Sequence, residues 1–176
     1  MIIALSGPAG SGKGTLARML AKYLGLPHYD IGLLFRAIAY ANFKIHHLKV
    51  KDGRIFFCDI DITDILKTEE CGLCAAKSAF LLKDLVLLFV SDASFICDGR
   101  TCGSEIFPNA NYKFYITANQ KDRFDRRLKD GGNLEIMSQR EILDQSRLVI
   151  PADAIIIDTT GKNQDESLQE MILHLR

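Results

Sequence analysis

The strongest constraint on the fold of this chain is a glycine-rich stretch close to its N-terminus. Residues 6–15 read SGPAGSGKGT; the short apolar run Ile2–Ser6 leads into them, and the segment Thr15–Leu24 carries leucines at helical spacing. A buried strand, a glycine-rich turn and a helix in this order are typical of a loop that holds phosphate groups. Glycines let the backbone amides converge without clashes from Cβ atoms, and the helix adds the positive end of its dipole.

This loop carries the groups that a triphosphate requires. Lys13 is expected to bridge the β- and γ-phosphates, and the hydroxyl of Thr15 to bind Mg²⁺. The usual pattern places Ser or Thr directly after the lysine, whereas Gly14 intervenes here. The alternative is a glycine-rich turn without a ligand, which the spacing, the lysine and the context disfavour. The residues expected to bind the nucleotide are Gly7, Pro8, Ala9, Gly10, Ser11, Gly12, Lys13, Gly14 and Thr15.

The rest of the chain alternates strand-like and helix-like segments, which predicts an α/β fold with a parallel sheet flanked by helices. Further strands are expected at 95–97, 112–117 and 154–157, and further helices at 31–43, 119–129, 135–148 and 166–175. The less regular middle, 44–90, has a turn at 51–54, a short strand at 55–58 and a helical pattern at 68–90. We expect one domain over residues 1–176, with a small insertion on the main sheet in this middle region.

Composition excludes several classes of protein. The formal net charge is zero, so no overall positive field attracts nucleic acid or anionic lipid. The longest apolar run, 85–90, is too short to span a membrane, and the N-terminus lacks the basic segment of a signal peptide. We therefore expect a cytoplasmic protein without nucleic-acid or membrane partners. Its expected partners are small molecules, and its expected oligomeric state is a monomer. The five cysteines are an odd number, which predicts free, mostly buried thiols.

Arginines recur at helical spacing in two later segments. The first contains Arg123, Arg126 and Arg127, and the second contains Arg140, Asp144 and Arg147. Each set would share one helix face, and guanidinium groups make forked contacts with phosphate oxygens. The alternative is a pair of solvated helices with intrahelical ion pairs, which contribute only about 0.2–0.5 kcal/mol each.

Several segments together resemble a known family. The string GPAGSGKGT resembles bacterial cytidylate kinases, which are P-loop nucleoside monophosphate kinases. Residues 30–36, DIGLLFR, are similar to the family's Asp-Ser/Thr-Gly-x-x-Tyr-Arg segment. Other similar segments are DGR at 98–100, FPNA at 107–110, the arginines at 123–127 and 140–147, and the last strand with its flanks at 151–160. The resemblance covers about residues 1–36 and 95–160, and the chain is shorter than typical members.

This resemblance implies the P-loop NTPase-like fold, with a reduced NMP-binding insertion at about 37–94 and a short lid with its arginine helices at about 120–147. It implies phosphoryl transfer from ATP to CMP or dCMP with Mg²⁺. The implied catalytic residues are Lys13, Arg126, Arg127 and Arg147, and the implied acceptor-binding residues are Asp30, Arg36, Arg100, Arg140, Asp144 and Arg147. Mg²⁺ is expected at Thr15 and Asp98. A kinase for another nucleotide or small acceptor, and a nucleotide-binding protein without turnover, remain alternatives.

The chain departs from the family pattern at three positions in the acceptor half. Ile31 stands in place of Ser or Thr, Thr101 in place of Asp, and Leu85 in place of an arginine. A lost charge-assisted contact removes about 1.5–3 kcal/mol of binding. These departures affect the expected acceptor more than the expected phosphate donor.

Overall fold

The structure, a computed structural model, describes residues 1–51, 53–145 and 148–175. Within its helices the side chains of residues 69, 76–82, 134, 137, 140 and 143–145 lie outside this description. The chain divides into two compact units, one of Met1–His28 with Asp92–Arg176 and one of Tyr29–Ser91.

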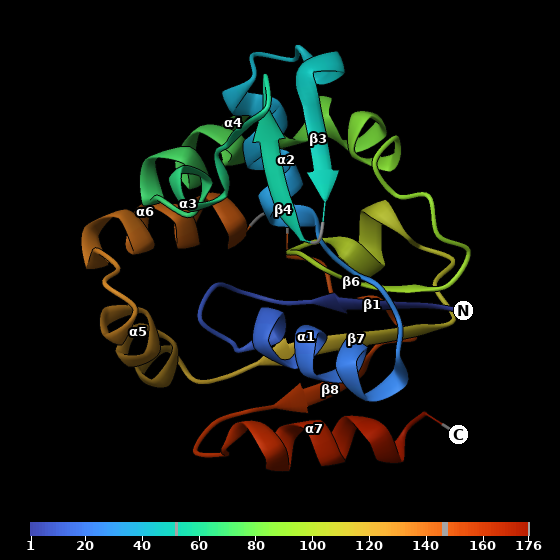
Figure 1. The fold of residues 1–176 in the computed structure, drawn as a ribbon. Helices are drawn as coiled ribbons and strands as arrows, with labels where there is room; N and C mark the ends of the chain where they lie inside the picture. The colour runs from blue at the N-terminus through green and yellow to red at the C-terminus, as the bar shows by residue number, and fades with distance from the viewer. Residues whose placement is uncertain (52, 146–147, 176) are drawn as a thin grey trace. The chain divides into compact units, whose positions relative to one another are not determined.

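The first unit contains four whole strands of a five-stranded sheet and the first residue, His28, of the fifth (Figure 1). The strands of this sheet lie in the order β2 (His28–Asp30), β6 (Phe95–Asp98), β1 (Ile2–Ser6), β7 (Tyr112–Thr117) and β8 (Ile155–Asp158). β1 pairs in parallel with both β6 and β7, and β7 pairs in parallel with β8. The predicted α/β fold with a parallel sheet is therefore confirmed. Parallel strands bring their carboxyl ends to one edge, where ligands bind in such sheets.

The two faces of this sheet are covered differently. Ile3 and Leu5 of β1 pack against α1 (Lys13–Leu24) and α7 (Gln164–Leu173) in one buried cluster. Because side chains alternate along a strand, Ser6 faces the other way. There its Oγ accepts a hydrogen bond of 2.9 Å from the amide of Gly103 in η2 (Cys102–Ile106), a short π-helix. The sheet is thus buried on both sides, as the apolar sequence of β1 predicts.

Two further helices follow β7 in the first unit. α5 (Gln120–Lys129) begins after Asn119, whose side chain accepts a hydrogen bond of 2.7 Å from the amide of Asp122. α6 (Leu134–Gln145) contacts α5. An asparagine cap satisfies an amide that the first turn leaves without a partner, which explains where α5 starts.

The second unit combines helices with a small antiparallel sheet. α2 (Ile31–Tyr40) packs against α4 (Glu69–Leu87). The elements between them in the sequence are η1 (Ile45–His47), β3 (Leu48–Lys51), β4 (Arg54–Phe57), β5 (Ile60–Asp61) and α3 (Thr63–Leu66). The sequence pattern predicts one short strand here, whereas the described part of this unit has three, paired in the order β3-β4-β5. β3 was missed because only its first residue, Leu48, is buried, so the strand lacks an alternating apolar pattern.

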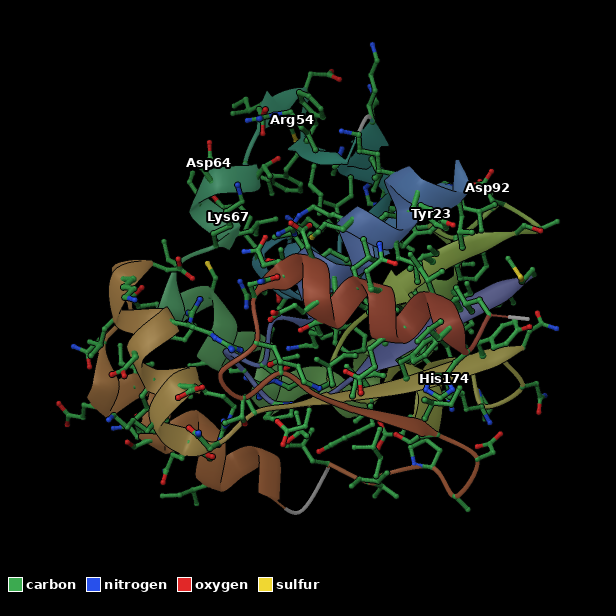
Figure 2. All side chains as sticks on the ribbon, turned by 90° about the horizontal axis from the view of Figure 1, so that it is seen from below. Tyr23, Arg54, Asp64, Lys67, Asp92 and His174 are labelled. Carbon is green, nitrogen blue, oxygen red and sulfur yellow. The ribbon has the colours of Figure 1, made fainter. Side chains whose placement is uncertain are left out.

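An ion-pair network lies on the surface of the second unit (Figure 2). The guanidinium of Arg54 pairs with Asp61 and lies 3.6 Å from the carboxylate of Asp64, which also pairs with Lys67 at 2.8 Å. The hydrogen bond from Arg54, helped by bonds from Thr63, lowers the pKa of Asp61 to about 2. The charged form of Asp61 is therefore favoured in the folded chain.

Replacing Asp61 with asparagine is expected to destabilise the protein in a pH-dependent way. A carboxylate with a lowered pKa stabilises the folded state above its unfolded pKa of 3.8, and this contribution is lost as the pH falls toward about 2. Urea unfolding at pH 6, 4 and 2 should show a difference between wild type and Asp61→Asn that shrinks with falling pH. A difference that stays constant down to pH 2 would assign Asp61 a role independent of its charge.

The cysteines and the helices bear on two further expectations. The five cysteines, all of which the structure describes, form no disulfide, and Cys97 and Cys102 are buried. Cys58 and Cys74 are exposed, however, so the prediction of mostly buried thiols was wrong. Cys58 occupies a turn with a φ of 50°, after the buried part of β4 has ended.

In the part of the chain that the structure describes, no helix is long and apolar enough to cross a membrane.

Candidate active site

The glycine-rich loop follows β1 and packs closely against two other elements. Gly7, Gly10 and Gly12 have φ angles of 140°, 76° and 89°. A Cβ atom on Gly7 would lie 2.1 Å from the carbonyl oxygen of Ile116 in β7, and one on Gly10 would lie 2.5 Å from that of Arg123 in α5. The glycines are therefore required for close backbone approach as well as for the left-handed turns of the loop.

Four consecutive carbonyls of this loop accept hydrogen bonds from side chains. The bonds run from Lys13 Nζ to Pro8 (3.1 Å), from Arg123 to Ala9 (3.3 Å), from Arg126 to Gly10 (3.4 Å) and from Thr159 Oγ1 to Ser11 (3.0 Å). No described peptide bond is cis, and in a trans peptide the C=O and N–H groups point in opposite directions. The amides of Gly10 and Gly12 therefore point away from the side chains that hold the carbonyls. Amides oriented in this way form a concave site for an anion.

The first turn of α1 completes the loop. The helix starts at Lys13 after the left-handed Gly12, so its first amides and its positive dipole end lie at the loop. Ser11 is completely buried, and its hydroxyl meets no hydrogen-bond partner among the described residues. Buried hydroxyls are normally satisfied, so this oxygen fits a ligand atom that would bind in the loop. Lys13 and Thr15, both predicted site residues, are half-buried here.

Two arginines of α5 donate hydrogen bonds to carbonyl groups of the loop. Arg123 is 8% exposed; besides Ala9, it donates to the carbonyl of Ala118 at 3.2 Å and forms an ion pair with Glu141 of α6. Burial raises the pKa of Tyr115, and the positive charge of Arg123 opposes this rise. Arg123 therefore stabilises the position of the loop, and its guanidinium binds other groups of the protein.

Arg126, like Arg123, donates to a carbonyl of the loop, and Arg127 is the next residue of α5. Arg126 donates to the hydroxyl and the carbonyl of Thr159, at 2.9 and 2.8 Å. Arg127 is half-buried, and its carbonyl accepts a hydrogen bond of 2.8 Å from Gly132, where α5 has ended. The catalytic roles expected for Arg126 and Arg127 stay predictions.

Thr159 is a site residue that sequence reasoning missed. It is 3% exposed and follows β8, where its hydroxyl contacts Ser11, Thr117 and Arg126. A polar residue directly after a buried strand lies at the carboxyl edge of the sheet, and this signal was available in the sequence. Which loop it contacts depends on the strand order, which the sequence does not state.

The predicted metal residue Asp98 ends β6 beside the start of α1. Its Oδ1 lies 2.7 Å from Nε2 of His28, and its Oδ2 would lie 3.3 Å from a Cβ atom on Gly14. Thr15 follows Gly14, so both predicted Mg²⁺ residues adjoin the first turn of α1. Among the residues that the structure describes, no three His, Cys, Asp or Glu side chains gather to hold a metal. A divalent cation would therefore need phosphate oxygens as well, as Mg²⁺ commonly does.

The expected acceptor residues are divided between the two units. Arg100 is half-buried and lies two residues after Asp98 in the first unit. In the second unit, Asp30 caps α2 by accepting from the amide of Leu33 at 2.8 Å, and Arg36 donates to the carbonyl of Leu66 at 3.0 Å. Arg147 and the side chains of Arg140 and Asp144 lie outside the described residues.

Two of the positions that depart from the family pattern are buried. Ile31 is 1% exposed at the start of α2, and Thr101 is 6% exposed. The carbonyl of Thr101 accepts a hydrogen bond of 2.9 Å from Glu105, within the turn that forms η2. Both side chains are therefore withdrawn from solvent, whereas Leu85 of α4 is half-buried.

The sequence was compared with those of known proteins. The sequence model of the family described as cytidylate kinase matches residues 3–72 and 45–176. A protein named cytidylate kinase from Thermotoga neapolitana is 32% identical over 97% of this chain and 94% of its own length. The chain belongs to the cytidylate kinase family. Another family member, from Clostridioides difficile, is 31% identical over 98% of this chain and 96% of its own length.

This family member can also be compared with related proteins in length and in fold. The alignment with the Thermotoga cytidylate kinase spans 208 positions, so that relative carries segments that the 176 residues here lack. TT1252 from Thermus thermophilus matches 99% of this chain and 95% of its own, with a TM-score of 0.57 at 17% identity. An uncharacterized protein from Eubacterium ventriosum covers 99% and 97%, with a TM-score of 0.54 at 16% identity. These two structures share the fold.

Proposed function

We propose that this cytidylate kinase family member transfers the γ-phosphoryl group of ATP to CMP or dCMP, giving ADP and CDP or dCDP. The observation that carries the proposal is the loop at 6–15, whose carbonyls at Ala9, Gly10 and Ser11 accept hydrogen bonds from Arg123, Arg126 and Thr159. The amides of Gly10 and Gly12, which point away from these side chains, are thereby oriented for an anion before any ligand binds. Preorganised donors of this kind stabilise charge that develops during a reaction.

On the donor side, the loop amides and the first turn of α1 bind the triphosphate of ATP. A phosphate oxygen of the acceptor forms the new bond to the γ-phosphorus, while the bond to the bridging oxygen breaks and leaves its electron pair on ADP. Lys13 stabilises the charge on the transferred group. No general base is needed, because the attacking phosphate oxygen is already anionic.

Thr15 and Asp98 are the residues that would hold Mg²⁺ together with the phosphates. Their oxygen donors and their place beside the first turn of α1 fit a cation that binds through few protein ligands. When bound, Mg²⁺ would neutralise part of the charge of the phosphate oxygens.

The arginines serve the two anionic substrates. We assign Arg126, Arg127 and Arg147 to the transferring phosphoryl group, and Arg126 also donates to the loop that binds it. The proposed acceptor residues are Asp30, Arg36, Arg100, Arg140, Asp144 and Arg147. We assign the second unit, Tyr29–Ser91, to the acceptor-binding insertion, and α5 and α6 to the lid. We propose that the protein acts as a cytoplasmic monomer on these small molecules.

An acceptor panel tests this proposal directly. ADP release is measured with Mg²⁺ and ATP against CMP, dCMP, UMP, AMP and GMP at equal concentrations. We expect kcat/KM for CMP or dCMP to exceed that for each other nucleotide by at least about tenfold, because unpaired polar groups penalise the wrong base. A preference for another acceptor would overturn the assigned substrate. CMP binding without ADP release would overturn the assigned turnover.

A further inference from the structure

His28 contacts the carboxylate of Asp98 inside the first unit. His28 begins β2 and Asp98 ends β6, and their side chains are 17% and 7% exposed. Nε2 of His28 lies 2.7 Å from Oδ1 of Asp98. An ionised carboxylate can only accept hydrogen bonds, so the imidazole donates from Nε2. The phosphate-loop mechanism described above leaves this histidine without a role.

The contact fixes which oxygen of Asp98 faces the loop. With Oδ1 held by His28, Oδ2 is directed toward Gly14, where an added Cβ atom would lie only 3.3 Å away. The guanidinium of Arg18, 3.5 Å from the same Cβ position, also adjoins this space. The terminal torsion of an aspartate is broad, so an Asp98 side chain without this partner would sample other orientations.

The same contact explains why position 14 is a glycine. Its φ is not in the positive range that demands glycine, unlike that of Gly12. A side chain at position 14 would instead crowd Oδ2 of Asp98. The glycine therefore leaves space for a carboxylate oxygen beside Lys13 and Thr15.

We propose that His28 is a positioning residue that holds Asp98 with Oδ2 directed toward the phosphate loop, and so increases the affinity for a divalent cation in the nucleotide complex. This inference rests on the proposed role of Asp98 in cation binding. Groups that hydrogen-bond a ligating side chain fix its orientation, and their loss typically weakens metal binding by about 10–100-fold. A neutral donor at Nε2 is sufficient for this role.

Binding of Mn²⁺ in the presence of a non-hydrolysable ATP analogue tests the inference without turnover. The free Mn²⁺ signal in electron paramagnetic resonance gives the affinity, and titration of the analogue in EDTA gives the nucleotide affinity alone. We expect His28→Leu to weaken Mn²⁺ binding by about tenfold and to leave the analogue affinity in EDTA unchanged. His28→Gln, whose amide can donate from the position of Nε2, should retain most of the Mn²⁺ affinity.

Two further variants separate the possible outcomes. His174→Leu, at the exposed end of α7 (Figure 2), is the matched control and should bind Mn²⁺ like wild type. If Asp98→Asn loses Mn²⁺ affinity and His28→Leu does not, the positioning role is wrong while the role of Asp98 stands. If Asp98→Asn binds Mn²⁺ normally, the proposed cation site itself fails.

The comparison of glutamine with asparagine keeps the test decisive if His28→Leu does not fold. Asparagine also carries an amide but is too short to place it at Nε2. The positioning role requires His28→Gln to bind Mn²⁺ more tightly than His28→Asn. Equal losses in the two variants would show that packing of the imidazole matters and its donor does not, and would overturn the inference.

Discussion

Replacing Lys13 with alanine is expected to lower kcat by about 100–1,000-fold, which is the usual cost of removing one preorganised donor from a developing charge. The lysine is already at the loop, where its Nζ donates to the carbonyl of Pro8 at 3.1 Å. Because the charge to be stabilised is largest in the transition state, kcat should fall more than the affinity for ATP. Steady-state kinetics with ATP and CMP measure both effects.

The matched control for this variant is Lys22→Ala, which removes an exposed lysine from the last turn of the same helix. It should leave kcat close to that of wild type. Thermal unfolding should show that Lys13→Ala keeps the fold, since its contact with Pro8 is only partly buried. A kcat within about threefold of wild type for Lys13→Ala would remove the loop lysine from the mechanism.

Replacing Gly7 with alanine is expected to lower the free energy of unfolding by about 2–6 kcal/mol and to abolish tight nucleotide binding. Its φ of 140° is strained for any residue with a Cβ atom. The added atom would also lie 2.1 Å from the backbone oxygen of Ile116, in the middle of the buried sheet. β7 cannot move without breaking its pairing with β1, so the loop must leave its position.

Gly25→Ala separates this clash from the cost of the backbone angle. Gly25 ends α1 with a φ of 65°, and a Cβ atom there would meet no other atom within 4 Å. We expect this control to lose about 1–2 kcal/mol and to bind nucleotide normally. Urea unfolding and titration with a fluorescent ATP analogue compare the two. Equal losses of stability with intact binding would contradict the role of the contact between Gly7 and β7.

The elements with the clearest sequence patterns were predicted well. The strand expected at 112–117 coincides with β7, and those at 95–97 and 154–157 lie within one residue of β6 and β8. Buried parallel strands are short apolar runs, and the helices between them show the 3.6-residue period, so both signals are local. The glycine-rich loop was found for the same reason, since its spacing and flanking elements are contiguous in the chain.

The parts that were missed depend on distant neighbours. β2 has only three residues, and two of them, His28 and Asp30, are polar, so no apolar run marks it. Helical spacing places Arg123 and Arg126 on one face of α5, but it does not say that this face holds the loop carbonyls. The pair of His28 and Asp98 joins residues 70 positions apart, which sequence spacing alone cannot bring together.

The attachment of the loop carbonyls to α5 and to Thr159 bears on protein engineering. A chimaera that transplanted only residues 6–15 would carry every glycine and the lysine but none of the groups that fasten the loop at Ala9, Gly10 and Ser11. The smallest set of residues that could transfer the loop intact is therefore discontinuous in sequence, and it extends to Thr159, after β8. A designer who borrows this anion-binding loop has to combine three separate segments of the polypeptide: the loop, α5 and the residues around Thr159.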